Sequence, residues 1–142
     1  MNEDINALDE INKGACMGMD AIDDILDKVE NKELKKELKR EYNAYKDISK
    51  RIEEIYPKYN EGEPHETSAM NKIMTDMMLN MKTMTDTSNS KIAEILLQGV
   101  NMGIIEGRKI LNKKNLNEEV NEIVETYVTM QEESVNILKD YL

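Results

Sequence analysis

Two short stretches of this chain, Gly14-Ala15-Cys16-Met17-Gly18 and Gly99-Val100-Asn101-Met102-Gly103, share the pattern Gly-x-x-Met-Gly. Both lie in segments whose other residues are typical of helices. A glycine in the interior of a helix destabilises that helix by about 1 kcal/mol relative to alanine. We therefore expect these glycines to allow a close contact, either between two helix backbones or between a helix and a large side chain.

Gly107 lies one helical turn beyond the second stretch, so Gly99, Gly103 and Gly107 share one helix face. Met17 and Met102 point away from the main apolar stripe of their helices. Either another helix covers these two methionines or they face outward, where they would suit a contact between two copies of the protein. The sequence thus predicts helix contacts or interactions at Gly14, Met17, Gly18, Gly99, Met102, Gly103 and Gly107.

The similarity between the two stretches continues along the chain when 85 is added to each residue number. The identical pairs are Gly14 and Gly99, Met17 and Met102, Gly18 and Gly103, Ile25 and Ile110, Leu26 and Leu111, Lys28 and Lys113, Glu33 and Glu118, Glu37 and Glu122, Tyr42 and Tyr127, Ser49 and Ser134, Ile52 and Ile137, and Tyr56 and Tyr141. Apolar seam positions align in part between any two bundled helices, but shared glycines and methionines do not follow from that. We therefore predict an internal repeat, in which a helical hairpin is duplicated.

Apolar residues recur every three or four positions along most of the chain, as in helices that pack into a bundle. This period predicts helices over about 4–30, 32–56, 66–84, 91–113 and from about 115 onward. Pro57 ends the second of these helices, and good N-cap residues in 85–90 separate the third from the fourth. A continuous helix through 85–90 is the alternative. Asn115 and Glu118 are spaced like a capping box at the start of the last helix.

These elements predict an all-α fold in a single domain, residues 1–142. The first two helices and the last two would form hairpins related by a pseudo-twofold axis. The third helix would join them as a long, methionine-rich crossover, which is the connection of ferritin-like bundles. We therefore expect a ferritin-like bundle.

A ferritin-like bundle raises the question of a di-iron site, which takes glutamates from two helices and Glu-x-x-His from the other two. The single histidine, His65, lies in a loop, and Ala44 stands where histidine belongs in the nearest match, Glu41-Tyr42-Asn43-Ala44. We therefore expect no di-iron site. Glu41 and Glu106 remain candidates for a residual cation site, although Glu41 would more simply reach solvent or pair with a lysine or arginine.

Methionines gather on one face of the expected third helix, at Met70, Met74, Met77, Met81 and Met84. Their thioethers are soft ligands that suit Cu(I). Methionine also packs well into irregular cores, and we expect core packing to be the main role of this face. A copper site and a flexible surface for a partner or ligand are the alternatives.

The sequence offers no recognisable catalytic set. Cys16, the only cysteine, stands between Ala15 and Met17, and the single histidine is far off in sequence, so we expect an inert thiol. The glycines lie inside helices rather than between a strand and a helix, which argues against a phosphate-binding loop. We therefore expect no cofactor, and the sequence favours a protein that is not an enzyme.

The charge pattern limits the class of partner. The formal net charge of −10 disfavours binding to nucleic acid and to anionic membranes. We find no apolar stretch long enough to span a bilayer, and the chain opens with acidic residues rather than a signal sequence. These features predict a cytoplasmic protein.

Residues 78–111 carry a set of short motifs: Asn80-Met81-Lys82-Thr83, Asp86, Ser88, Ser90, Ile92-Ala93-Glu94, Gln98-Gly99 and Asn101-Met102-Gly103-Ile104. This segment resembles a family of small bacterial proteins, a domain of unknown function, that are regarded as ferritin-like bundles without the di-iron ligands. The resemblance implies the fold and no activity. Our leading functional hypothesis is a non-catalytic bundle that works through a homodimer or a protein partner. The alternative is binding of Cu(I) or a small ligand by the methionine face or the core carboxylates.

Overall fold

The computed structural model describes residues 2–60, 64, 76 and 79–142. Its long elements are α1 (Asn2–Leu26), α2 (Lys32–Ile55), α4 (Asn89–Asn112) and α5 (Glu118–Leu138), with 3-10 turns η1 (Tyr56–Lys58) and η2 (Lys139–Tyr141). None of the described residues forms a strand, so this part of the chain is all-helical, as predicted. Within the same residues, no helix combines the length and apolar character needed to cross a membrane.

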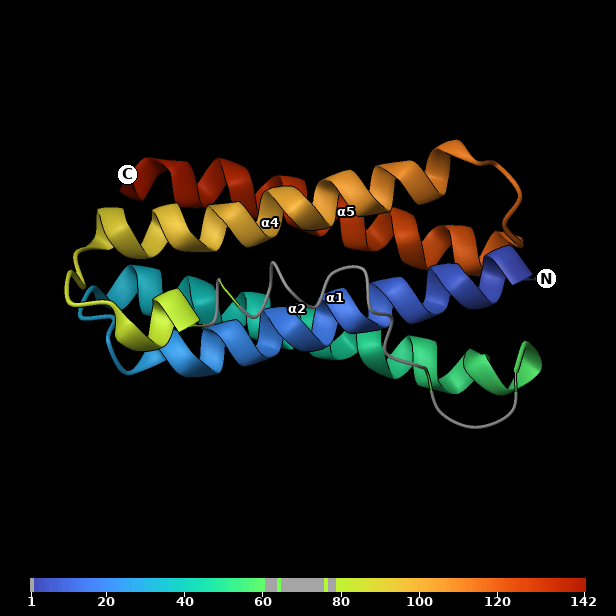
Figure 1. The fold of residues 1–142 in the computed structure, drawn as a ribbon, viewed down its shortest axis with the longest axis horizontal. Helices are drawn as coiled ribbons and strands as arrows, with labels where there is room; N and C mark the ends of the chain where they lie inside the picture. Colours follow the sequence, from blue (N-terminus) through green and yellow to red (C-terminus); the bar gives the residue numbers. More distant parts are fainter. Residues whose placement is uncertain (1, 61–63, 65–75, 77–78) are drawn as a thin grey trace.

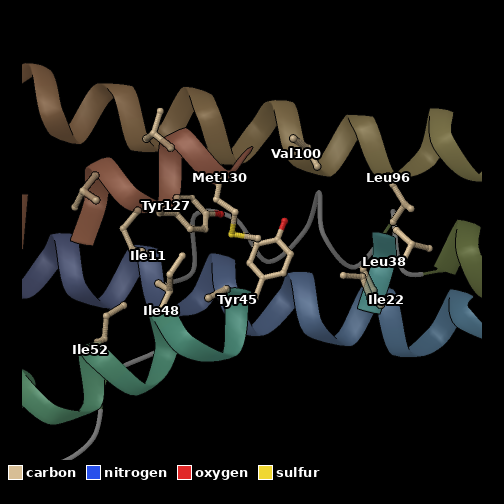
Figure 2. Close-up of a cluster of buried hydrophobic side chains, with 14 of the residues drawn as sticks. Ile11, Ile22, Leu38, Tyr45, Ile48, Ile52, Leu96, Val100, Tyr127 and Met130 are labelled. Carbon is tan, nitrogen blue, oxygen red and sulfur yellow. The ribbon is translucent and has the colours of Figure 1, made fainter. Parts of the chain in front are cut away.

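The four long helices lie along the long axis of the molecule (Figure 1). α1 packs against α2, and α4 packs against α5. The two pairs then meet through contacts of α2 with α5 and of α1 with both α4 and α5. Apolar side chains from all four helices form one core, part of which is shown in Figure 2. The inside of this bundle is where the glycine-containing faces of α1 and α4 meet side chains from α2 and α5.

Local signals place the first two helices close to their predicted bounds. α1 ends at Leu26, four residues earlier than expected, and the Lys28 N–H bonds back to the Ile25 carbonyl in the turn that follows. The Asn31 side chain then accepts a 2.9 Å hydrogen bond from Leu34 N and caps α2. α2 ends at Ile55, where the 3-10 turn that contains Pro57 begins.

Most of the expected third helix, with Met70, Met74 and Met77, lies outside the described residues. Residues 79–83 are helical, whereas 84–88 are not. The Ser88 side chain accepts a hydrogen bond from Lys91 N at 3.2 Å and caps α4. The predicted break before the fourth helix is therefore confirmed, and the alternative of a continuous helix is wrong.

The start of α5 corrects a prediction. The N-cap is Asn117, which makes no side-chain capping bond, rather than Asn115 in a capping box with Glu118. Because α5 begins at Glu118, its third residue is Val120, whose side chain has no acceptor. The buried carboxylate of Asp4 in α1 takes over that role, since its Oδ1 accepts a 2.9 Å hydrogen bond from Asn117 N.

Candidate functional site

The glycines of the two Gly-x-x-Met-Gly segments face side chains inside the bundle. A Cβ atom at Gly18 would lie 2.5 Å from Cε2 of Tyr45, and one at Gly103 would lie 2.8 Å from the Tyr127 hydroxyl oxygen. At Gly14, the same atom would lie 3.0 Å from Cζ of Tyr127. All three glycines therefore make room for a tyrosine that projects from α2 or α5.

Four of the predicted glycines converge on a single cavity, which we call the central pocket. Its volume is about 30 Å³, enough for roughly two water molecules. All four long helices contribute to its wall, because the lining residues are Gly14, Met17, Gly18, Ala21, Ile22, Glu41, Tyr45, Leu96, Gly99, Val100, Gly103, Tyr127 and Gln131. Gly107 does not line the pocket and instead faces Val128 of α5.

A buried hydrogen-bonded chain crosses the pocket. The Tyr45 hydroxyl donates to Oε1 of Gln131 at 2.6 Å, and Nε2 of Gln131 donates to the Tyr127 hydroxyl oxygen at 3.1 Å. Figure 2 shows both tyrosines in the middle of the core, with ring centroids 6.4 Å apart and ring planes tilted by 52°. Burial raises the pKa of Tyr127 to about 12 and the pKa of Tyr45 well above its ordinary value. Both hydroxyls therefore keep their protons at neutral pH.

Glu41 is the carboxyl group of this pocket. Glu41 is only 2% exposed. Among the described residues, its Oε2 atom has no hydrogen-bond partner. Burial, reinforced by the nearby Glu37 carboxyl, raises the pKa of Glu41 to about 8, while Ser134 and Arg40 partly oppose this rise. Glu41 is therefore mainly protonated at neutral pH.

The expectation that Glu41 reaches solvent or pairs with a basic residue is wrong. Its seam position keeps the side chain inside the bundle. The nearest guanidinium, that of Arg40, instead forms a two-pronged pair with Glu37, with both N–O distances at 2.7 Å. The hydroxyl of Ser134 on α5 is also buried, and it lies beside the Glu41 carboxyl, whose ionised form it stabilises.

The remaining predicted site residues lie away from this carboxyl. Glu106 is half-buried on α4, 3.8 Å from Nζ of Lys109, and it does not line the pocket. Met81 is fully buried, and Met84 is half-buried against the core. The described residues contain no cluster of three or more histidine, cysteine, aspartate or glutamate side chains that could hold a metal ion.

Met17 and Met102 occupy related but distinct places. Both are half-buried and pack against the core. Only Met17 lines the central pocket. Cys16 is also half-buried, with its Sγ atom 4.0 Å from Oγ of Ser49.

Sequence reasoning did not assign Tyr45, Tyr127, Gln131 or Ser134 to a site. Tyr45 and Tyr127 follow the apolar period and are typical of core positions. Ser134, a polar residue within the apolar stripe of its helix, was the available signal. Gln131 gave no such signal, because it stands beside Glu132 and Glu133 in a polar stretch.

Comparison with protein families matches residues 3–113 to the family described as Domain of unknown function (DUF2383). The match covers more than half of the chain, which therefore belongs to this family. The matched part includes Glu41 and the glycine segments, and it ends before α5, which supplies Tyr127 and Gln131. Comparisons with curated proteins and with solved structures give no match.

Proposed function

We propose that this member of the DUF2383 family binds a small polar ligand in the central pocket. One observation carries the proposal: the buried carboxyl of Glu41 borders a cavity at the point where the two Gly-x-x-Met-Gly segments meet. A buried polar group without a partner costs about 1–3 kcal/mol. Native proteins normally satisfy such groups with protein, water or ligand. A cavity of about 30 Å³ suits a ligand with one or two non-hydrogen atoms.

The surrounding polar groups are held in defined orientations, as expected for a binding site. Gln131 is fixed at both ends of its amide by Tyr45 and Tyr127, at 2.6 and 3.1 Å. The ring of Tyr45 in turn packs beside Gly18, where no side chain could fit without displacing it. The pocket is therefore built from side chains that hold one another in place.

A high-resolution crystal structure of the protein purified without added ligand tests this function. We expect electron density for a bound group within hydrogen-bond distance of Glu41. Native mass spectrometry should show a mass increment that disappears on denaturation and that distinguishes this group from water. An empty pocket, or density without any mass increment, would contradict the proposal.

Copper storage is the form of ligand binding that the methionine face would support. Met81 and Met84 are the members of that face within the described residues, and Met81 is fully buried in the core. Anaerobic titration with Cu(I), together with elemental analysis of the purified protein, tests this alternative. An absence of tight Cu(I) binding would remove it.

A second candidate function is association with another copy or with a protein partner in the cytoplasm, without catalysis. The supporting observation is Ile105, which is 54% exposed on α4. If α4 forms the contact, Ile105→Ser should weaken a dimer measured by analytical ultracentrifugation, whereas the exposed neighbour change Asn101→Ser should not. A wild-type protein that stays monomeric at high concentration and binds no partner would contradict this candidate.

We also infer that the two hairpins arose by duplication and resemble a ferritin-like bundle. Gly18 and Gly103, which are 85 residues apart, both lie against a tyrosine from the second helix of their own hairpin. The tyrosines are Tyr45 and Tyr127, although the 85-residue offset aligns Tyr127 with Tyr42. An experimental structure whose halves fail to superpose by a twofold rotation would refute this inference.

A further inference from the structure

We propose that the ligand of the central pocket is a small ammonium-type cation, ammonium or methylammonium, held by the carboxylate of Glu41 beside Tyr45 and Tyr127. This inference rests on the proposed function, because it names the chemical class of the ligand for the same pocket. Three properties of the pocket support it: its excess of hydrogen-bond acceptors, its aromatic walls, and its charge and size.

The polar atoms around the pocket are mostly acceptors. Oε2 of Glu41, a lining residue, is buried and has no hydrogen-bond partner among the described residues. Ser134 does not line the pocket and lies beside the Glu41 carboxyl instead. The Tyr45 hydroxyl donates its hydrogen bond to Gln131, so the lone pairs of its oxygen can still accept a hydrogen bond. Once Glu41 has lost its proton, a ligand that satisfies its buried oxygen must donate hydrogen bonds. An ammonium group donates only, whereas water must also find donors for its lone pairs.

The aromatic walls favour a positive charge. Tyr45 and Tyr127 both line the pocket, and their ring centroids are 6.4 Å apart. A cation within about 6 Å of a ring centroid is attracted by the negative potential over the ring, more strongly where water is excluded. Because both tyrosines line the cavity, a cation bound there lies beside both aromatic side chains.

The charge of the pocket sets the charge of the ligand. On α2, Glu37 and Arg40 lie near Glu41 and form an ion pair with each other. On α5, Ser134 lies near Glu41, and Glu133 lies near Arg40. The lining residues from α1 and α4 carry no titratable group. Ionised Glu41 is then the one charged group among the lining residues, and Glu10 on α1 adds a negative charge near Tyr127. A monovalent cation is therefore favoured over an anion or a neutral ligand. The described residues lack the clustered ligands that a divalent metal needs.

Proton and ligand compete for the same carboxylate. Because burial raises the pKa of Glu41 to about 8, the cation must displace a proton at neutral pH. The apparent affinity should therefore fall roughly tenfold for each pH unit below that pKa. The volume of about 30 Å³ adds a size limit that admits methylammonium and excludes tetramethylammonium.

Thermal melts near the pKa of Glu41 test this inference. The wild-type protein is compared in the chlorides of ammonium, methylammonium, sodium and tetramethylammonium at equal ionic strength. At concentrations about tenfold above Kd, we expect ammonium and methylammonium to raise Tm by roughly 3–5 °C relative to the other two salts. Glu41→Gln should abolish this difference, Ser134→Ala should reduce it, and the half-exposed control Glu106→Gln should keep it.

Equal melting temperatures in all four salts would overturn the inference, as would a stabilisation by sodium alone or one that survives in Glu41→Gln. A structure from crystals grown with methylammonium distinguishes the class of ligand from the proposed function, which is ligand binding in the pocket. Density for a neutral polar molecule in the pocket would overturn the ligand class and leave the proposed function standing. An empty or water-filled pocket under the same conditions would overturn both.

Discussion

Tyr45 and Gln131 join the two hairpins of this bundle through one short hydrogen bond. The hydroxyl of Tyr45 on α2 lies 2.6 Å from Oε1 of Gln131 on α5, and both residues are buried. The bond spans 86 residues of sequence. It therefore couples helices that belong to different hairpins and fixes the amide that borders the central pocket.

Tyr45→Phe should destabilise the protein by about 1–3 kcal/mol, because it leaves the Gln131 carbonyl buried without a donor. The ring and its contact with Gly18 remain, so the change tests the hydroxyl alone. Urea unfolding followed by circular dichroism gives the free energy of unfolding. The double variant Tyr45→Phe with Gln131→Leu should recover part of the loss, since no carbonyl is then left unpaired. A single variant as stable as the wild type would show that the bond contributes nothing.

Gly103→Leu should destabilise the fold by about 3 kcal/mol or more, although leucine is the better helix former. The added side chain would meet Gln131 and the Tyr127 hydroxyl, which the surrounding helices hold in place. Asn101→Leu, on the exposed face of the same helix, is the matched control and should be neutral or stabilising. If the thermal melt of Gly103→Leu is unchanged or raised, the glycine is not needed for this contact.

The helices were predictable because each one repeats its own local signals. The apolar period recurs within every long helix, and Ser88 lies next to the helix that it caps. The cap of α5 was not predictable in this way, because the acceptor for Asn117 N is Asp4, 113 residues earlier in the sequence. Spacing within a segment cannot show an acceptor that the fold brings from another helix.

The residues of the candidate site also fall into two groups: those with a signal in their own segment and those whose role depends on the fold. Glu41 stood out because a charged residue interrupts an apolar stripe, and the glycines stood out because they weaken a helix. The role of Gln131 depends on which face of α5 meets α2, and its sequence neighbours Glu132 and Glu133 suggest a solvated surface. The hydrogen bond from Tyr45 therefore had to be seen in the fold.

Asp4→Ala should destabilise the protein by about 1 kcal/mol, because the first N–H of the α5 cap loses its acceptor. Hydrogen exchange at Asn117 should accelerate more than exchange in the middle of α5. Glu3→Ala changes the exposed neighbouring carboxylate and is the control for charge at this helix end. Unaltered exchange at Asn117 in Asp4→Ala would mean that Asp4 does not act as the cap.

Glu41 should make the stability of the protein fall as the pH rises from about 4.5 to about 8. The sign follows from its raised pKa: in this range the unfolded chain has lost the Glu41 proton, whereas the folded chain still holds it. The slope that Glu41 adds is at most about 1.4 kcal/mol per pH unit. Glu37 acts in the opposite sense and at lower pH, because its pKa lies below the ordinary value.

Glu41→Gln isolates this contribution, since the amide has the shape of the carboxyl but does not titrate. Urea unfolding is measured at several pH values in buffers free of ammonium and amines. The free energy of unfolding of the variant, relative to that of the wild type, should rise with pH up to about pH 8 and then stay constant. All other titrating groups are common to both proteins and cancel in the comparison. Parallel pH profiles for the two proteins would show that Glu41 ionises in the folded state as readily as in the unfolded chain, and would remove the physical basis for a proton held at the centre of the bundle.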